Sequence, residues 1–299
     1  MDFLHKDREQ FLEAINLAEH QTGVMAQAIE KDYYVTMILR MLADRVPYIV
    51  FKGGTSLSKC HKVIKRFSED IDITVDIALS QGEKKKVKYI IVDIVQELGL
   101  QVINLEETRS RRDYNKYIIS YDTVLPMLSE ALQPEVLMET SYISVSFPTV
   151  ILPVSSYIGE MMVVEAPELI QTYALEPFEM KVQGIERTLV DKVFAVCDYY
   201  LNDLVKKHSR HIYDIYKLLP LVTLDKDFKD LVEEVREIRK ASLKCPSAQD
   251  GVNIPKTLRT IVEKEVYKID YQEITEKILK EQVPYMTAVE ALEEIARKW

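Results

Sequence analysis

The chain has 299 residues, of which 47% are hydrophobic, and its formal net charge at pH 7 is −9. That apolar content can bury one large core or two moderate ones. The acidic balance excludes a global basic field that would attract nucleic acid, so any contact with phosphate must come from local basic patches.

The first half of the chain predicts a mixture of helices and strands. Apolar residues recur at helical spacing over residues 7–44, with Gly23 between two predicted helices. Residues 48–51 predict a short buried strand that ends in a Gly-Gly pair, and residues 55–65 follow as a predicted helix. Further strands are predicted at residues 71–75, 101–105, 116–121 and 134–140, and an amphipathic helix at residues 83–98.

The second half of the chain is mostly helical in its pattern. The predicted helices cover residues 186–203, 208–219 and 227–242, and two more follow residue 255. Pro167 and Pro177 interrupt regular structure between the two halves. The predicted fold is therefore α+β, with a mixed-sheet core and N-terminal helices in residues 1–175 and a helical domain in residues 176–299.

Cysteine spacing and hydropathy indicate the compartment. Cys60, Cys197 and Cys245 are far apart and form no metal-ligand spacing, so a zinc site is not expected. No apolar stretch approaches the length of a membrane span, and the N-terminus has no apolar signal core. We expect a cytoplasmic protein that makes no membrane contact.

The turn after the first predicted strand has the features of a phosphate cradle. Gly53 and Gly54 would let the backbone approach a ligand closely. A helix that begins at Thr55 would point its free N–H groups into the same gap, where its dipole favours an anion. Thr55 and Ser56 add hydroxyl donors, although the segment lacks the Lys-Ser/Thr ending of a P-loop.

An acidic pair follows the cradle. Asp70 and Asp72 are two residues apart on a predicted strand, so both side chains lie on one face. Neighbouring carboxylates repel each other unless a cation lies between them, and their hard oxygens suit Mg²⁺. A third acid on a neighbouring strand would position a second metal ion and the attacking hydroxyl, and Glu139 is the best candidate.

Each of these features also has a structural interpretation. A Gly-Gly pair alone is usually a turn, and for Glu139 an exposed strand carboxylate fits as well as a metal ligand. Lys192 sits at the edge of the apolar stripe of its predicted helix, so its head could reach a cleft or its stem could cover the core. Asp214 falls on the polar side of its predicted helix, which by periodicity alone indicates a surface acid. The order strand, Gly-Gly, helix, Asp-x-Asp strand favours a site.

The same segments resemble a known family. Residues 51–59 (FKGGTSLSK) and 66–72 (RFSEDID) closely resemble motifs of the AbiEii/AbiGii toxin family, in the DNA polymerase β-like nucleotidyltransferase superfamily. Residues 30–34 (EKDYY) resemble a segment upstream of the glycines. Residues 186–192 (ERTLVDK) and 210–214 (RHIYD) look like the third and fourth motifs of that family, with a histidine where an acidic or polar residue is expected.

This resemblance implies a nucleotidyltransferase core followed by a helical bundle. It further implies a toxin of an abortive-infection or toxin–antitoxin system that moves a nucleotide monophosphate from an NTP, with Mg²⁺ or Mn²⁺, to an acceptor. Some relatives use the acceptor end of tRNA, so an RNA end is the expected acceptor and a cognate antitoxin a further partner.

Roles for individual residues follow from the match. The nucleotide-binding set is Lys52, Gly53, Gly54, Thr55, Ser56 and Lys192. The catalytic set is Asp70, Asp72, Glu139, Lys192 and Asp214, of which Asp70, Asp72 and Glu139 would hold the metal. Glu139 enters the catalytic set and the metal-binding set by its placement alone.

Alternative functions and the acceptor contacts stay open at the level of sequence. The alternatives are a nucleotide-binding protein with weak or no catalysis, transfer to a protein acceptor, and a metal nuclease, against which the glycine cradle argues. RNA would be held by local basic clusters. These are Lys59, Lys62, Lys65 and Arg66; Arg109, Arg111 and Arg112; and Lys206, Lys207 and Arg210.

Overall fold

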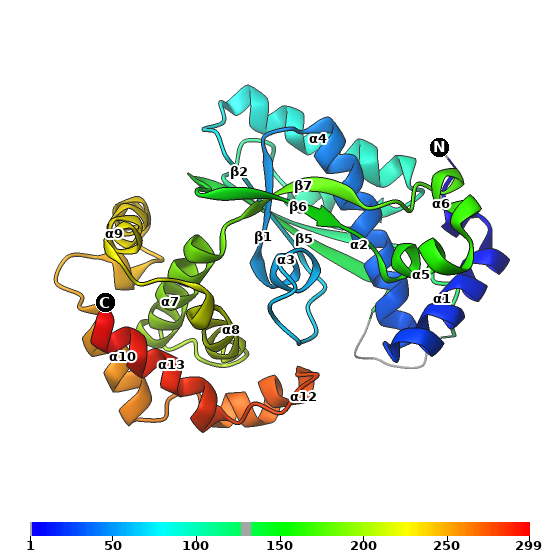
Figure 1. The fold of residues 1–299 in the computed structure, drawn as a ribbon. Helices are drawn as coiled ribbons and strands as arrows, with labels where there is room; N and C mark the ends of the chain where they lie inside the picture. The colour runs from blue at the N-terminus through cyan, green and yellow to red at the C-terminus, as the bar shows by residue number, and fades with distance from the viewer. Residues whose placement is uncertain (1, 127–132) are drawn as a thin grey trace. The chain divides into compact units, whose positions relative to one another are not determined.

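The computed structural model describes residues 2–126 and 133–299, which form two compact units (Figure 1). Unit 1 comprises Met1–His61 and Ser68–Val182, and unit 2 comprises Lys62–Phe67 and Gln183–Trp299. The contacts thus divide the chain after Val182, while the predicted boundary between residues 175 and 176 stays a prediction. In sequence, the six residues Lys62–Phe67 interrupt unit 1, but they pack with unit 2.

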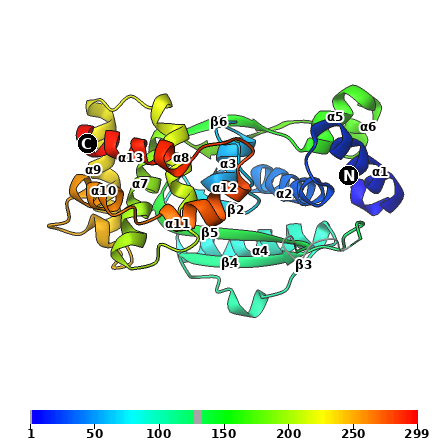
Figure 2. The ribbon, with the colours of Figure 1, turned by 90° about the horizontal axis from the view of Figure 1, so that it is seen from below.

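Unit 1 is built on a seven-stranded mixed sheet, which confirms the predicted α+β class. The strand order is β3-β4-β5-β2-β1-β7-β6. β2 is antiparallel to β1 and parallel to β5, β5 is antiparallel to β4, and β1 is parallel to β7. Figure 2 shows β4 and β5 running side by side. The strands are β1 Ile49–Lys52, β2 Ile71–Val75, β3 Gln101–Val102, β4 Tyr114–Ser120, β5 Glu135–Val145, β6 Thr149–Val154 and β7 Phe178–Gln183.

Helices cover one face of this sheet. Alternate strand residues such as Ile71 and Ile73 are fully buried in one core with the apolar sides of α1, α2 and α4, and α4 lies above the strands in Figure 1. The remaining strand positions, including Asp72, point to the opposite face. The helices of unit 1 are α1 Arg8–Thr22, α2 Ala26–Arg45, α3 Gly53–Lys59, α4 Gln81–Glu97, α5 Tyr157–Glu165 and α6 Pro167–Thr172, with short 3₁₀ turns at Leu4–Lys6 and Leu105–Glu107.

The predicted helical pair in residues 7–44 is confirmed as α1 and α2. Gly23 ends α1 with a φ of 68°, a left-handed conformation that glycine adopts at little cost. α4 begins with a reciprocal capping box between Ser80 and Glu83. No helix in the described part of the chain has both the length and the apolar character that a membrane crossing requires.

Two sequence predictions were wrong in detail. The helix expected at residues 55–65 is α3, Gly53–Lys59, because the chain leaves it to pair with a distant segment of unit 2. The strand expected at residues 101–105 stops at Val102, where a 3₁₀ turn follows.

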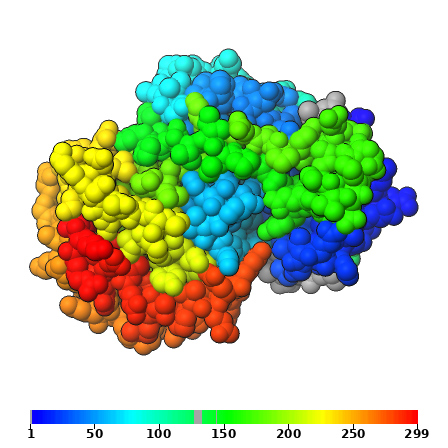
Figure 3. All heavy atoms as spheres, viewed as in Figure 1, coloured from blue at the N-terminus to red at the C-terminus, as the bar shows by residue number. Residues whose placement is uncertain are grey.

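β6 and β7 were not predicted. β6 (TVILPV) shows no simple alternation and contains Pro153, whereas β7 (FEMKVQ) alternates apolar and polar residues and has the periodicity of a strand. β6 is an edge strand of the sheet. Its Val150 and Ile151 are 40% and 62% exposed, and green atoms of this region lie at the surface in Figure 3. An edge position leaves one side of the strand unpaired, which tolerates a proline.

Unit 2 is helical, as predicted, and it includes one short piece of extended pairing. Arg66 forms an isolated antiparallel bridge with Leu279. The Phe67 N–H donates to the Ile278 carbonyl at 3.0 Å, and the Lys280 N–H donates to the Lys65 carbonyl at 2.8 Å. The helices are α7 Ile185–Leu201, α8 Arg210–Leu218, α9 Lys226–Lys240, α10 Ile254–Glu263, α11 Lys268–Asp270, α12 Glu276–Ile278 and α13 Tyr285–Lys298, with a π-helical turn at Tyr271–Thr275 and 3₁₀ turns at Leu219–Leu221 and Pro246–Ala248.

Candidate active site

A row of four charged residues crosses the face of the sheet that the core helices do not cover. Register pairs Lys52 with Asp72, Asp72 with Glu139, and Glu139 with Lys116. Directly paired residues on neighbouring strands project from the same face, and all four are at least partly exposed. The row therefore sets two adjacent carboxylates between two cations, and it places Glu139 on the strand next to Asp72, as the sequence predicts for the third acid.

The Asp72 carboxylate lies directly over Gly53. A Cβ atom built on Gly53 would stand 1.9 Å from Oδ2 of Asp72, and Gly53 has a φ of 79°. Both the space and the backbone conformation therefore require glycine at this position. Strand pairing of Lys52 with Asp72 brings the two groups together, so the turn after β1 and the acid on β2 form one structural unit.

The hydroxyl groups of the cradle helix have partners inside the protein. Ser56 is fully buried, and its Oγ donates to the Gly53 carbonyl at 2.9 Å. Oγ1 of Thr55 lies 3.0 Å from Oγ of Ser68, which ties α3 to the segment that leads into β2. These bonds hold the Gly53-Gly54 turn in place. Direct contact of either hydroxyl with a triphosphate stays a prediction.

The residues of this face are compatible with a hard divalent cation. Asp70 is partly exposed and precedes β2 by one residue, two positions from Asp72. Within residues 2–126 and 133–299, no three His, Cys, Asp or Glu side chains are grouped as a ready ligand set. Glu139 Oε1 lies 3.8 Å from Lys116 Nζ. Two carboxylates fit Mg²⁺ if water and substrate phosphates complete its coordination, which is the usual arrangement for this ion.

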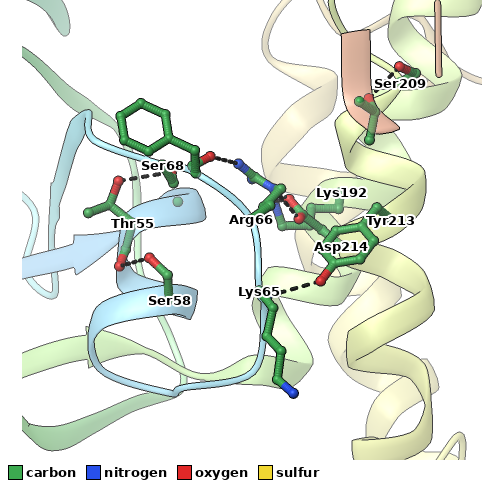
Figure 4. A network of polar contacts seen from close by, with 12 residues as sticks. Thr55, Ser58, Lys65, Arg66, Ser68, Lys192, Ser209, Tyr213 and Asp214 are labelled. Atoms are coloured by element: carbon green, nitrogen blue, oxygen red, sulfur yellow. Dashed lines mark hydrogen bonds and ion pairs between the residues drawn. The ribbon is translucent and has the colours of Figure 1, made fainter. Parts of the chain in front are cut away.

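The two remaining predicted residues, Lys192 and Asp214, contact each other in unit 2. Nζ of Lys192 donates to Oδ2 of Asp214 at 2.6 Å. Arg66 approaches the same carboxylate with two bonds, Nε to Oδ1 at 2.7 Å and Nη2 to Oδ2 at 2.8 Å. Figure 4 shows both cations converging on Asp214. The surface position that periodicity indicates for Asp214 was therefore wrong: the side chain is fully buried.

Burial and charge shift the pKa values in this cluster. Burial alone would raise the pKa of Asp214, but Arg66 and Lys192 hold it well below its usual range. Burial lowers the pKa of Lys192, and the attraction of Asp214 opposes that shift only in part, since Arg66 repels the ammonium. One carboxylate faces two cations, so these three side chains carry a net charge of +1 when all are ionised.

His211 adds an uncharged ring to this cluster. Burial lowers its pKa well below the ordinary value, and the nearby cations Lys192, Arg210 and Arg66 lower it further against the attraction of Asp214. The ring therefore stays neutral at neutral pH. It also stacks parallel to Tyr199, with ring centroids 5.7 Å apart.

A second contact holds the segment Lys62–Phe67 in unit 2. The Lys65 N–H donates to Oη of Tyr213 at 2.9 Å (Figure 4), and Oη of Tyr213 donates to Oε1 of Glu281 at 2.7 Å. Nζ of Lys217 donates to the same Glu281 oxygen at 2.8 Å. Residues on α8 thus anchor the connection between α3 and β2.

One of the three basic clusters predicted to lie at the surface does not form a surface patch, so that prediction was wrong. Lys59 is buried against Asp32, with Nζ 2.6 Å from Oδ1, and Arg66 is buried against Asp214. Only Lys62 and Lys65 of that cluster are exposed. The other two clusters are exposed as predicted: Arg109, Arg111 and Arg112, and Lys206, Lys207 and Arg210.

Sequence reasoning missed two sets of residues near the predicted site. Arg66 was assigned to a basic patch, because its partner Asp214 is 148 residues away and no local pattern links them. Lys31, Asp32 and Glu69 were given no role, although Lys31 and Asp32 belong to the segment of residues 30–34 singled out by resemblance. Adjacent charged residues in a largely apolar helix were the available signal.

Comparisons with known proteins give a family match and a structure of similar fold. The family described as "Nucleotidyl transferase AbiEii toxin, Type IV TA system" matches residues 38–298. Among solved structures, MenT4, a nucleotidyltransferase toxin from Mycobacterium tuberculosis H37Rv, is similar with a TM-score of 0.60 and 16% identity, over 94% of this chain and 87% of that one. At that identity the likeness concerns the fold. Comparison with curated proteins gives no match.

Proposed function

The chain belongs to the AbiEii family of nucleotidyltransferase toxins of type IV toxin–antitoxin systems, and from that premise we propose that it transfers a nucleotide monophosphate from an NTP to an RNA end. The observation that carries the proposal is the Asp72 carboxylate seated over Gly53, next to Glu139 in the charged row. This arrangement would bring the triphosphate at the Gly53-Gly54 turn next to a metal ion held by Asp72.

The residues of unit 1 would divide the work of the reaction. Gly53 and Gly54 let the backbone approach the triphosphate, and Lys52 lies beside them at the end of β1. Glu139 would accept a hydrogen bond from the acceptor hydroxyl and orient its oxygen. As the hydroxyl proton passes to Glu139, that oxygen bonds to the α-phosphorus, the bond between the α-phosphorus and the bridging β-phosphate oxygen breaks, and pyrophosphate leaves.

Asp70 and Asp72 would hold Mg²⁺ or Mn²⁺, which neutralises charge on the phosphates. Lys192 and Asp214 enter the proposal through the family match, with Lys192 on the phosphates. Two cations, Arg66 and Lys192, converge on Asp214, and this local concentration of positive charge supports an anion as a further partner of the cluster.

An RNA acceptor is supported by the two exposed basic clusters. Arg109, Arg111 and Arg112 lie in the connection before β4, and Lys206, Lys207 and Arg210 lie between α7 and the first residue of α8. On a chain of net charge −9, such clusters supply the local contacts that phosphates need. The resemblance specifies a tRNA end, and the toxin family implies a cognate antitoxin in the same cytoplasm.

The direct test is to incubate the purified chain with each α-labelled NTP and total RNA, with Mg²⁺, with Mn²⁺ and with chelator. The proposal expects label on RNA of one size class with one NTP, and only with a metal ion. Label on protein would replace the RNA acceptor with a protein acceptor. NTP binding without any transfer would contradict catalysis.

A further inference from the structure

Three consecutive charged residues of α2 each contact a different segment of unit 1: Glu30 and Lys31 are buried, and Asp32 is partly buried. Glu30 accepts from Oγ1 of Thr123 at 2.6 Å and from the Val124 N–H at 2.8 Å. Lys31 and Asp32 follow directly. Because successive residues on an α-helix point about 100° apart, adjacent side chains can reach separate elements. Charges are rarely buried unless they are paired, so these positions carry specific contacts.

Asp32 holds the C-terminal end of the cradle helix. Its Oδ1 accepts from Nζ of Lys59, the last residue of α3, at 2.6 Å, and its Oδ2 accepts from the Tyr157 N–H at 3.0 Å. Nζ of Lys59 also donates to the Ser155 carbonyl at 2.6 Å. The helix that begins at Gly53 is therefore fixed at its other end by α2 and by the turn before α5.

Lys31 holds the segment that enters β2. Its Nζ lies 3.0 Å from Oε2 of Glu69, and the lysine is only 5% exposed. Glu69 is the residue immediately before Asp70. An ion pair at Glu69 thus restrains the backbone that carries Asp70, at a point where the chain has not yet joined the sheet.

We propose that Lys31 and Asp32 are positioning residues, which fix the Asp70 segment and helix α3 relative to each other through one rigid helix. The inference rests on the proposed function, because it assigns Asp70 and the Gly53-Gly54 turn to metal and triphosphate. It gives a role to residues 30–34, which the chemistry of the site does not use. A metal site needs such outer contacts to hold its ligands in place.

The test measures binding of Mn²⁺ and inorganic tripolyphosphate, which needs neither the correct base nor an acceptor. Lys31→Met should weaken binding by about 10-fold to 100-fold, the usual cost of losing an outer contact of a metal site. Lys31→Arg should restore most of it. Asp32→Asn should weaken it as well, since a neutral amide has one acceptor oxygen and cannot accept from both Lys59 and the Tyr157 N–H.

Two comparisons separate positioning from the alternatives. Arg45→Met removes ion pairs to Asp93 and Glu97 at the other end of α2 and should lower the melting temperature without changing binding. Equal loss of binding in Arg45→Met would show a general effect of destabilising α2. If Lys31 acts through Glu69, the double variant Lys31→Met with Glu69→Gln should bind Mn²⁺ and tripolyphosphate as well as whichever single variant has the lower affinity.

If the loss of affinity in that double variant equals the product of the two single losses, Lys31 contacts the phosphates itself. Unchanged binding in Lys31→Met would show that the lysine has no positioning role. Either result overturns the inference. Wild-type protein that binds Mn²⁺ and tripolyphosphate but transfers no nucleotide would refute the proposed function alone. Transfer by the wild type together with unaffected Lys31→Met would refute positioning alone.

Discussion

The Asp72 carboxylate fills the space that a side chain at residue 53 would need: Oδ2 of Asp72 lies 1.9 Å from the point where a Cβ of residue 53 would be. No side chain larger than hydrogen can share that position, because real Cβ atoms do not approach another atom so closely. The position of the Asp72 carboxylate thus requires glycine at residue 53, and so does the φ of 79°.

Gly53→Ala should therefore displace the Asp72 carboxylate and reduce nucleotide transfer by about 100-fold or more, the scale of losing one strong contact to a transition state. Gly23→Ala is the matched control. It imposes a similar left-handed φ of 68°, but its Cβ meets nothing within 4 Å. Both variants should lose about 1–2 kcal/mol of stability, and only Gly53→Ala should lose activity. Full activity in Gly53→Ala would disprove the coupling of glycine and acid.

Asp214→Asn should destabilise the protein more than Lys192→Met. Loss of Asp214 leaves both Arg66 and Lys192 buried without their anion, and breaking a buried pair in this way costs about 3–5 kcal/mol. Lys192→Met leaves the two Arg66 bonds to Asp214 intact. Denaturant unfolding measures the difference. Lys192→Met should also weaken triphosphate binding, and a loss of stability with unchanged affinity would reduce the lysine to a structural role.

Stability should fall on mild acidification because of His211. The folded state holds its pKa well below the ordinary value, while an unfolded histidine binds a proton below about pH 6.5. Between those values the unfolded state binds more protons, so stability decreases as pH falls from 7 to 5, by at most about 1.4 kcal/mol per pH unit. His211→Asn should flatten this dependence relative to His20→Asn, an exposed control on α1. Equal slopes in the two variants would contradict the assignment.

Arg111→Glu with Arg112→Glu should weaken RNA binding and leave triphosphate affinity unchanged. Each phosphate contact to a single strand contributes a slope of about −0.7 to the dependence of log affinity on log salt, so the slope should also become shallower. Lys226→Glu with Lys229→Glu, an equal charge reversal on exposed positions of α9, is the control. An acceptor reaction that ignores both salt and the arginine change would favour a protein or small-molecule acceptor.

Sequence alone predicted the local elements that carry chemistry, because their signals are local. The Gly-Gly turn, the strand that carries Asp72 and the strand that carries Glu139 follow from short spacing rules, whereas Asp70, expected on the same strand as Asp72, lies just before β2. The register of β2 with β5 places Asp72 beside Glu139. β7 (FEMKVQ) was missed although its apolar and polar residues alternate as in a half-buried strand, and it pairs with β1.

Long-range ion pairs could not be predicted in this way. Asp214 appears on the polar side of α8 by periodicity, and only the approach of Arg66 and Lys192 explains its burial. The length predicted for α3 failed for the same reason, since the chain after Lys59 is drawn into pairing with Leu279. Local propensity cannot anticipate a partner more than a hundred residues away.

Nucleotide transfer by Asp72→Asn, measured together with its melting temperature, tests whether the Asp72 carboxylate holds the metal ion that the reaction uses. Asparagine keeps the shape of the side chain over Gly53 but removes the charge that would hold the metal. Transfer by this variant with Mg²⁺ or Mn²⁺ should fall by at least about 100-fold, while its melting temperature should stay near that of the wild type. Turnover close to the wild type in Asp72→Asn would contradict the metal-dependent mechanism.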